Sequence, residues 1–553
     1  MKLTNFLALF LLVTFPSISQ ESSFFENPVI SGDMADPSII RVGDTYYATA
    51  TSSEWAPFYP VFTSTDLINW EQAGHVFNEK PEWTSHSFWA PELYYHNGTM
   101  YCYYSARRKS DNLTYIGVAT AEGTSLCFKD HGLIVELGSE AIDAFVYDDN
   151  GQLYITWKAY GLDKRPIELL GSRLSDDGLR LEGEPFSLLK DDEEIGMEGQ
   201  YHFKQGDYYY ILYSAKSCCG PSSDYDVRVA RSKHFKGPYE KYGGNPILSG
   251  GDGVGGDGDF ISVGHGTAVK VPDGRYFYLS HGYQSGDAFF LGRQPVLHEL
   301  EITDEDWVRF TTGKQAVIRQ PVPFEGTMQK RISGFKDDFS GETLKGGKLG
   351  GKTLKGKTLK GKTLKGETLK GETLKVEWTW NYPYADINAT LKNGELILTG
   401  KPVGGNEHGT ALCLRPQTTH YSYQAKINNI NDSFKGLTMY GDDKNLVAFG
   451  IAGNRVELRL VKEGDESVLF RTVPEKEISH FKIDVERGCF LTFSYSEDGS
   501  SWVKVNDTPV YTAFLVRWDR VARPGLIHIG EAEAPAVIDY FVLDLYYSSG
   551  LNN

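Results

Sequence analysis

Apolar and polar residues alternate along short segments through most of the chain, and turns containing Gly separate these segments. One segment begins at Asp36 and reads DPSIIRVGDTYYAT, in which a short apolar run is followed by a Gly turn and a second apolar run. Two alternating runs joined by a Gly turn are typical of a β-hairpin. The pattern therefore predicts one strand before Gly43 and a second strand after it.

The same hairpin pattern recurs at nearly regular intervals along the first half of the chain. Its copies begin at Asp36, Ala90, Asp143, Glu198 and His265. A second strand–turn–strand pattern, such as VFTSTDLINWEQAG, follows each copy, so each unit contains about four strands. Repeated four-stranded units predict a five-bladed β-propeller over residues 21–322. A pair of β-sandwiches would also alternate strands, but it would not repeat one hairpin at near-constant spacing.

A second all-β domain is predicted for residues 336–548, after a linker at 323–335. Its alternating segments, such as GELILTGKP and HFKIDVERGCFLTFSYS, favour a sandwich of two antiparallel sheets. Residues 341–375 are near-identical pentads such as GKTLK. A Gly in every pentad disfavours a helix by about 1 kcal/mol per Gly relative to Ala. We interpret the pentads as an expanded, disordered surface loop without chemistry.

The first 20 residues have the pattern of a secretory signal peptide. Lys2 precedes a nearly continuous apolar run over residues 6–15, and Ser17-Ile18-Ser19 resembles a small-residue cleavage site. The run is too short to span a membrane, and no run of eighteen apolar residues follows it. We therefore expect a secreted or periplasmic protein without a membrane span. The alternative is a buried N-terminal strand.

Composition narrows the set of partners. The formal charge is −17 over 553 residues, which repels nucleic acid and favours a neutral substrate. The 6 cysteines are too sparse for a disulfide scaffold, and no spacing resembles a zinc site. Cys218 and Cys219 are adjacent, which leaves open either a strained disulfide between them or two free thiols.

The starts of the five hairpin copies carry the candidate chemistry. In a propeller, the first strand of each blade lines the central channel, so the five starts should converge on one pocket. They present Asp36, the segment WAPE at 89–92, Asp143, Glu198 and His265. A single Asp at a strand start is more often a turn cap or an ion-pair partner. Clustered carboxylates raise one another's pKa and destabilise the fold, so proteins accept them mostly at functional sites.

Paired carboxylates serve glycoside hydrolysis, in which one acid protonates the leaving oxygen and one base activates water. Glu198 is the predicted acid, because Gly196, Met197 and Gly199 flank it with little polarity and should raise its pKa. Asp143, from the neighbouring unit, should raise this pKa further and orient Glu198. Asp36 is the predicted base.

Several motifs together resemble glycoside hydrolase family 43. They are ADPSIIRVGDTYY, TSTDLINW, FWAPELYYHNGTMYCYYS, IDAFVYDDNGQLYITW, MEGQYHFKQGDYYYILYSA and GHGTAVKVPDGRYFYLSH. The resemblance implies a five-bladed, inverting enzyme with Asp36 as general base, Glu198 as general acid and Asp143 as modulator of the acid's pKa. The second domain resembles the concanavalin-like sandwich appended to many members of this family.

The resemblance also implies further roles. Arg293, in FLGRQP, matches a family arginine that reaches the pocket. His265 matches a channel residue that in many members accompanies a calcium or sodium ion or water, although catalysis itself requires no cofactor. The substrate-binding candidates are Trp89, Trp157 and Phe58, with Trp55 as a second wall of the pocket. For these aromatic residues, packing within the blades is the alternative.

The predicted function is hydrolysis of plant cell-wall polysaccharides or oligosaccharides that contain arabinose or xylose. Exo-acting α-L-arabinofuranosidase, β-xylosidase or both is favoured. An endo-arabinanase of the same family and a non-catalytic sugar-binding propeller remain alternatives. The invertase-like fructosidases are disfavoured, because they begin with Asp-Pro-Asn-Gly whereas here Ser38 follows Asp36-Pro37.

Overall fold

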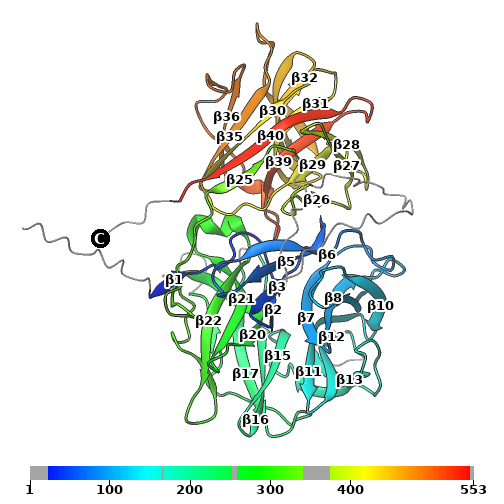
Figure 1. The fold of residues 1–553 in the computed structure, drawn as a ribbon, viewed down its shortest axis with the longest axis vertical. Helices are drawn as coiled ribbons and strands as arrows, with labels where there is room; N and C mark the ends of the chain where they lie inside the picture. Colours follow the sequence, from blue (N-terminus) through cyan, green and yellow to red (C-terminus); the bar gives the residue numbers. More distant parts are fainter. Residues whose placement is uncertain (1–22, 163–166, 221, 252–257, 341–373, 548–553) are drawn as a thin grey trace, which may run out of the picture.

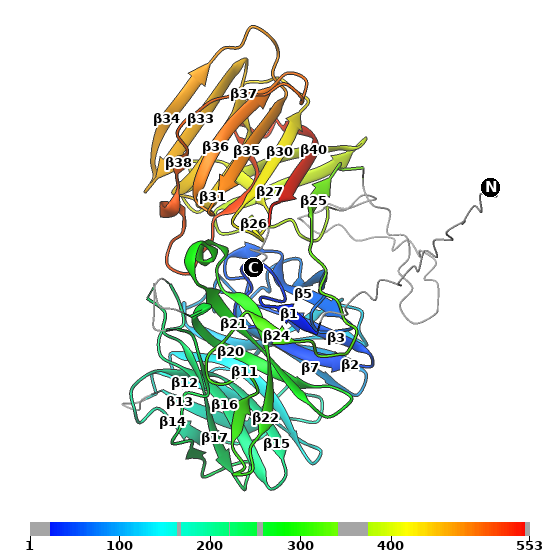
Figure 2. The ribbon, with the colours of Figure 1, turned by 90° about the vertical axis from the view of Figure 1, so that its left-hand side faces the viewer.

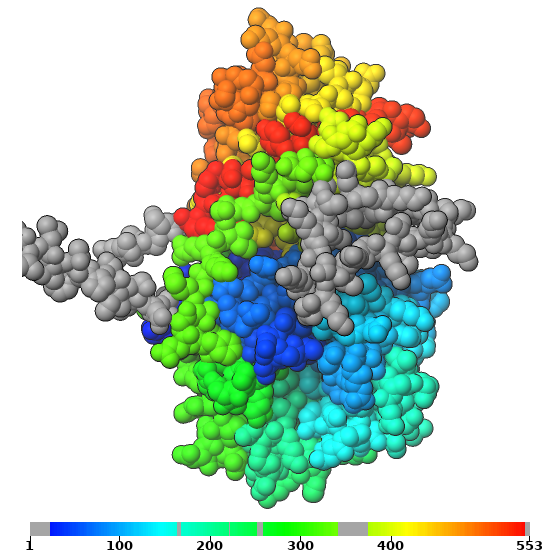
Figure 3. Space-filling view, viewed as in Figure 1, coloured from blue at the N-terminus to red at the C-terminus, as the bar shows by residue number. Residues whose placement is uncertain are grey.

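The computed structural model describes residues 23–162, 167–220, 222–251, 258–340 and 374–547. The predicted signal peptide and almost all of the pentad repeat lie outside these residues. The chain forms two β domains, a propeller drawn from blue to green and a sandwich drawn from yellow to red (Figure 1). In the space-filling view the sandwich sits directly on the propeller (Figure 3). None of the helices in the described ranges is long and apolar enough to cross a membrane.

Within the described residues, the propeller has five blades of antiparallel strands, as predicted. The first blade contains β2 (Ser38–Val42), β3 (Thr45–Thr49), β5 (Phe58–Ser64) and β6 (Glu71–Phe77). The second contains β7 (Trp89–His96), β8 (Thr99–Arg107), β9 (Thr114–Glu122) and β10 (Lys129–Val135). The third contains β11 (Glu140–Asp149), β12 (Gln152–Tyr160), β13 (Glu168–Arg173) and β14 (Phe186–Lys190).

The last two blades complete the ring. The fourth contains β15 (Met197–Gln205), β16 (Tyr208–Ala215), β17 (Asp226–Ser232), β18 (Glu240–Lys241) and β19 (Leu248–Ser249). The fifth contains β20 (Phe260–Lys270), β21 (Tyr276–Gln284), β22 (Gln294–Ile302) and β23 (Val308–Phe310), with the 3₁₀ helix η1 (Gly286–Leu291) between β21 and β22. The innermost strands β2, β7, β11, β15 and β20 contact one another in this order, and β20 contacts β2 again. Pairing of β1 (Phe24–Glu26) with β24 (Arg319–Pro321) holds the two ends of the propeller together.

A left-handed residue recurs within each innermost strand or just before it. Its φ is 54° at Asp36, 39° at Ala90, 59° at Asp143, 60° at Gly199 and 41° at His265. In the last four blades the pairing register shifts around this residue, as in a β-bulge. Positive φ is uncommon for residues other than Gly and persists where the surrounding structure imposes it, often at functional sites.

The second domain is a sandwich of two antiparallel sheets. One sheet contains β25 (Gly334–Asp337), β27 (Ala385–Lys392), β28 (Glu395–Pro402), β30 (Tyr421–Ile427), β35 (His480–Glu486), β36 (Phe490–Ser496), β37 (Val503–Lys504), β38 (Val510–Tyr511) and β40 (Ala536–Leu545). The other contains β29 (Thr410–Cys413), β31 (Phe434–Asp442), β32 (Asn445–Ala452), β33 (Arg455–Lys462), β34 (Asp465–Thr472) and β39 (Arg523–Ile529). A short 3₁₀ helix, η2 (Ala513–Leu515), precedes β39. Apolar side chains from both sheets form the core, in which Trp378 is 2% exposed.

The two domains share a small sheet. Strand β26 (Trp380–Asn381), at the base of the sandwich (Figure 2), pairs with β4 (Trp55–Ala56) of the propeller. The Arg523 guanidinium lies 3.9 Å from the centre of the Trp55 ring, and Arg520 forms an ion pair with Glu54. Backbone pairing and ion pairs therefore hold the sandwich against one face of the propeller.

Replacing Trp378 with Ala should destabilise the sandwich by about 3–5 kcal/mol, because it leaves a cavity in a close-packed core. The ring packs among Phe335, Phe339 and Phe541, and its indole N–H donates to Asp337 at 2.8 Å. Urea unfolding followed by circular dichroism would measure the loss.

The matched control is Trp502→Ala. This partly exposed ring contacts the Lys482 ammonium at 5.1 Å, so its loss should cost less than about 1 kcal/mol. Equal destabilisation by the two substitutions would contradict the assignment of Trp378 to the core.

Candidate active site

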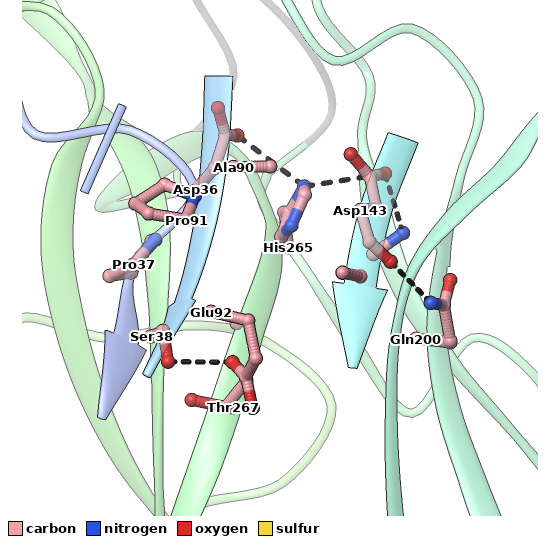
Figure 4. A pocket seen from close by; sticks show the side chains of 13 residues that line it. Asp36, Pro37, Ser38, Ala90, Pro91, Glu92, Asp143, Gln200, His265 and Thr267 are labelled. Carbon is pink, nitrogen blue, oxygen red and sulfur yellow. Dashed lines mark hydrogen bonds and ion pairs between the residues drawn. The ribbon is translucent and has the colours of Figure 1, made fainter. Parts of the chain in front are cut away.

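One cavity near the propeller axis is lined by residues from all five innermost strands or their starts (Figure 4). The five left-handed residues, Asp36, Ala90, Asp143, Gly199 and His265, all line it. The convergence expected from the repeat is thus present in the structure. Because the five blades place Asp, Ala, Asp, Gly and His at the same backbone position, these residues bring two carboxyl groups and an imidazole to the cavity wall, which Glu92 also lines.

Asp36 is held as a carboxylate. The Thr51 hydroxyl donates to its Oδ2 at 2.6 Å, and the Arg293 guanidinium lies 3.2 Å from its Oδ1. Burial alone would raise the pKa of Asp36, but Arg293 and His265 hold it well below its usual range. The Asp36 backbone N–H donates to Nδ1 of His281 at 3.0 Å, and the same nitrogen lies 3.2 Å from Oδ1 of Asp36.

His265 lies between two carboxylates. Its Nδ1 is 3.5 Å from Oδ1 of Asp36 and 4.0 Å from Oδ2 of Asp143 (Figure 4). A Cβ at Gly199 would lie 2.8 Å from Cγ of His265, so the imidazole fits only because position 199 has no side chain. In the described residues no group of three or more His, Cys, Asp and Glu side chains is arranged to hold a metal, and the ion expected near His265 stays a prediction.

Asp143 favours its protonated form, as does Glu92 of the same cavity, whose pKa burial raises to about 8. Asp143 is 5% exposed, and the Gly199 backbone N–H donates to its Oδ2 at 3.0 Å. Burial raises the pKa of Asp143 to about 7; His265 opposes this shift and the nearby Glu198 adds to it. Because the charge of Glu198 raises the pKa of Asp143, the two groups do not titrate independently.

Glu198 does not occupy the position that the repeat predicts. The left-handed residue of the fourth blade is Gly199, one residue later, and Glu198 is directed toward β12 and the loop before β17. Its Oε2 lies 2.9 Å from Nζ of Lys158, and its Oε1 accepts a hydrogen bond from the Tyr225 hydroxyl at 2.9 Å. Burial would raise the pKa of Glu198, but Lys158 lowers it below its ordinary value.

The expectation of a raised pKa at Glu198 is therefore wrong for this structure. It was based on the apolar sequence neighbours of Glu198, whereas the dominant opposing charge, Lys158, is 40 residues away in the chain. Neither Lys158 nor Tyr225 carries a motif that would have identified it. The same is true of Thr51, which only the fold brings to Asp36.

Two of the predicted sugar-binding side chains are core residues. Trp157 is fully buried within the third blade. Phe58 is 1% exposed, and its ring stacks on Phe88 at 4.1 Å. Neither side chain can contact a sugar here, because packing between strands encloses both. Trp55 is also buried, against Arg523, so it does not form a wall of the cavity.

Trp89 remains a candidate for the sugar site. It directly precedes Ala90 of the cavity wall and is partly exposed, with the Arg107 guanidinium 5.6 Å from its ring centre. No structural observation assigns it a ligand, so its sugar-binding role stays a prediction.

The sandwich is linked to the site through Arg293 of the propeller, which is buried and lies against Asp36. One nitrogen of its guanidinium faces Asp36, and another lies 3.1 Å from Asp519 of the sandwich. Asp519 is in turn 3.3 Å from Arg520, which pairs with Glu54 of the propeller. Alternating charges therefore connect the domain junction to Asp36.

Cys218 and Cys219 are joined by a disulfide. They lie in the loop that leads to Tyr225, and the backbone N–H of Gly220 donates to the Tyr283 hydroxyl at 3.1 Å. Of the two alternatives left open by the sequence, the structure contains the adjacent disulfide. It forms part of the segment that places the Tyr225 hydroxyl beside Glu198.

Two family models match the chain. The model of glycosyl hydrolases family 43 matches residues 25–308, and that of the beta xylosidase C-terminal concanavalin A-like domain matches residues 368–517. The first match covers the propeller, including Asp36, Asp143, Glu198, His265 and Arg293. The second covers much of the sandwich.

Individual proteins agree with these matches. The chain is 30% identical over 350 residues to a xylan 1,3-beta-xylosidase of a Vibrio species, an alignment that covers 58% of this chain and 63% of that protein. It is 27% identical over 456 residues to the non-reducing end alpha-L-arabinofuranosidase BoGH43B of Bacteroides ovatus, covering 78% and 76%. The crystal structure of the GH43 protein BlXynB from Bacillus licheniformis has the same fold, with a TM-score of 0.76, 21% identity, and coverage of 95% of this chain and 100% of that one.

Replacing Thr51 with Val should raise the pKa of Asp36 by about one unit or more, because hydrogen bonds to charged groups are worth about 1.5–3 kcal/mol. The substitution removes the 2.6 Å hydrogen bond to Oδ2 and keeps the side-chain shape. A titration of ¹³C-labelled aspartate carboxyls by NMR, with Asp36 assigned from the Asp36→Asn spectrum, would measure the shift.

Thr49→Val is the matched control. Thr49 is fully buried, and its hydroxyl has no hydrogen-bond partner among the described residues. The control should therefore leave the Asp36 titration unchanged. An unchanged titration in Thr51→Val as well would show that Thr51 does not stabilise the carboxylate.

Proposed function

The chain belongs to glycosyl hydrolases family 43, and from this premise we propose that it is an inverting glycosidase acting on arabinose- or xylose-containing plant polysaccharides or oligosaccharides. The observation that carries the proposal is the unequal environment of three buried carboxyl groups. Asp36 has a strongly lowered pKa, whereas Asp143 has a raised one and is coupled to Glu198. Glycoside hydrolysis by inversion needs one ionised and one protonated carboxyl group at the same site.

Each group has a role in the proposed reaction. Asp36, ionised, accepts a proton from a water molecule while the oxygen of that water bonds to the anomeric carbon. The glycosidic C–O bond breaks at the same time, and Glu198 gives its proton to the leaving oxygen. Asp143 assists Glu198 by sharing one proton with it near neutral pH, which Glu198 can then donate. Arg293 keeps Asp36 ionised and oriented.

The proposed substrates follow from the relatives. One relative is named for a β-xylosidase activity and another for a non-reducing end α-L-arabinofuranosidase activity. We therefore favour exo action on a terminal arabinofuranosyl or xylosyl unit, with an endo-arabinanase as the second candidate. A sugar-binding propeller without catalysis is disfavoured, because Asp36, Asp143 and Glu198 each retain counter-charges or hydrogen-bond donors suited to the reaction.

A secreted or periplasmic location is part of the proposal. It is supported by the pattern of the first 20 residues, with Lys2 ahead of an apolar run and small residues at 17–19. A calcium or sodium ion beside His265 stays an expectation from the family resemblance, and the proposed reaction does not use it.

Glu198→Gln should lower kcat/KM on the preferred substrate by about a hundredfold or more, because a missing general acid typically costs 10²–10⁴ in rate. Aryl α-L-arabinofuranoside, aryl β-xyloside, arabinan and xylan are the substrates to compare. Glu182→Gln, a substitution of an exposed glutamate, is the control and should behave as wild type. Full activity of Glu198→Gln would remove Glu198 from the reaction.

The first sugar released should have the opposite anomeric configuration to the bond that is cleaved, because water attacks directly from the opposite face. Proton NMR recorded during the first minutes of hydrolysis distinguishes the two anomers before they equilibrate. Initial release of the retained anomer would show a covalent intermediate and contradict the role of Asp36 as a base.

A further inference from the structure

Lys158 is a buried cation shared by two glutamates at the edge of the site. It extends from β12, and its Nζ lies 2.9 Å from Oε2 of Glu198 and 3.2 Å from Oε1 of Glu140. Its side chain is only 12% exposed. Glu140 begins β11, the strand that also carries Asp143, so the lysine bridges the first two strands of the third blade and Glu198 on the fourth.

Charged and titratable groups from four elements surround Glu198 in the described part of the chain. They are Lys158 from β12, Glu140 and Asp143 from β11, Tyr225 from the loop before β17, and His265 from β20. Lys158 is the one permanent cation in direct contact with the carboxylate among the described residues. The Tyr225 hydroxyl is a neutral donor, and its pKa is raised well above the usual value by burial and by Glu198.

This arrangement opposes the role proposed for Glu198. An ammonium group in contact with a carboxylate favours its ionised form, whereas a general acid must carry a proton. Ion pairs of this kind are also weak evidence for stability, because removing two charges from water is costly. A simple structural role therefore does not explain why a lysine touches this glutamate. Glu140 supplies an explanation, since it offers the same ammonium a second anionic partner.

We propose that Lys158 is a positioning residue that, shared between Glu140 and Glu198, sets the pH range over which Glu198 carries its proton. When the ammonium lies against Glu198, the proton of the pair resides on Asp143. When the ammonium is held by Glu140, Glu198 can take that proton and donate it to the leaving oxygen. No proton is gained or lost by the Asp143–Glu198 pair in this exchange. The inference rests on the proposed function in taking Glu198 as the acid.

The proposal predicts shifts of opposite sign in two variants. Lys158→Met removes the cation, so protonated Glu198 should persist to higher pH. The midpoint of the alkaline limb of the kcat/KM–pH profile should therefore move up by about one pH unit or more. Glu140→Gln leaves the ammonium to Glu198 alone, so the alkaline limb should move to lower pH. If Glu140 acts through Lys158, Glu140→Gln should shift the limb clearly less in the Lys158→Met background than in the wild type, whereas an equal shift would show that Glu140 acts only as a nearby negative charge. Lys158→Arg keeps the charge and should leave the limb near its wild-type position.

The decisive measurement does not require activity. Protein labelled with ¹³C at the glutamate carboxyls is titrated by NMR, and the Glu198 signal is assigned from its loss in Glu198→Gln. Its midpoint should rise in Lys158→Met and fall in Glu140→Gln. Glu140→Gln keeps the side-chain shape at a partly exposed position, so it tests the proposal even if Lys158→Met fails to fold.

The outcomes separate the two proposals. Unchanged midpoints, or midpoints that move in the same direction, would overturn the role of Lys158 whatever the activity. The role of Lys158 would be supported if the Glu198 midpoints shift in opposite directions and the alkaline limb of kcat/KM in the active protein shifts with them. Opposite shifts in a protein that hydrolyses no tested glycoside would refute the proposed function, and with it the catalytic consequence, while leaving the charge sharing demonstrated.

Discussion

The site depends on how three carboxyl groups are buried around one axis with few positive charges. Burial favours the neutral form of Asp36, Asp143 and Glu198 alike, so their neighbours decide which of them ionises. Arg293 lies against the first and Lys158 against the third, while Asp143 contacts no permanent cation in the described structure. Because two cations are distributed unequally over three acids, Asp36 becomes a base while Asp143 and Glu198 together carry a proton.

The backbone makes this crowding possible. A left-handed residue in each of the five blades lines the cavity, and the residue types at this position, Asp, Ala, Gly and His, differ in the chemistry they bring. Gly199 illustrates the steric part of the arrangement, because any side chain there would collide with His265. His265 in turn keeps its imidazole between Asp36 and Asp143. The repeat thus provides equivalent backbone positions, and the different side chains at these positions provide the chemistry.

The sandwich takes part in the same electrostatic arrangement. Asp519 accepts one side of the Arg293 guanidinium, whose other side faces Asp36. Because Asp519 also contacts Arg520, and Arg520 pairs with Glu54 of the propeller, the charges at the junction are connected to the site. The second domain is therefore a structural neighbour of the base, in addition to packing on the propeller through β26 and β4.

The sequence by itself determined the five-bladed ring, the sandwich and the convergence of Asp36, Asp143 and His265, because hairpin periodicity and turn chemistry are local properties that repeat visibly. It placed Glu198 one residue away from its true offset, and it assigned Phe58 and Trp157 to a sugar site although both are core residues. Only the tertiary structure decided the partners of each carboxyl group. Lys158 and Glu198 are 40 residues apart, and Arg293 and Asp519 are 226 apart. Charge contacts over such separations depend on how blades and domains pack, and no local pattern in the chain records them.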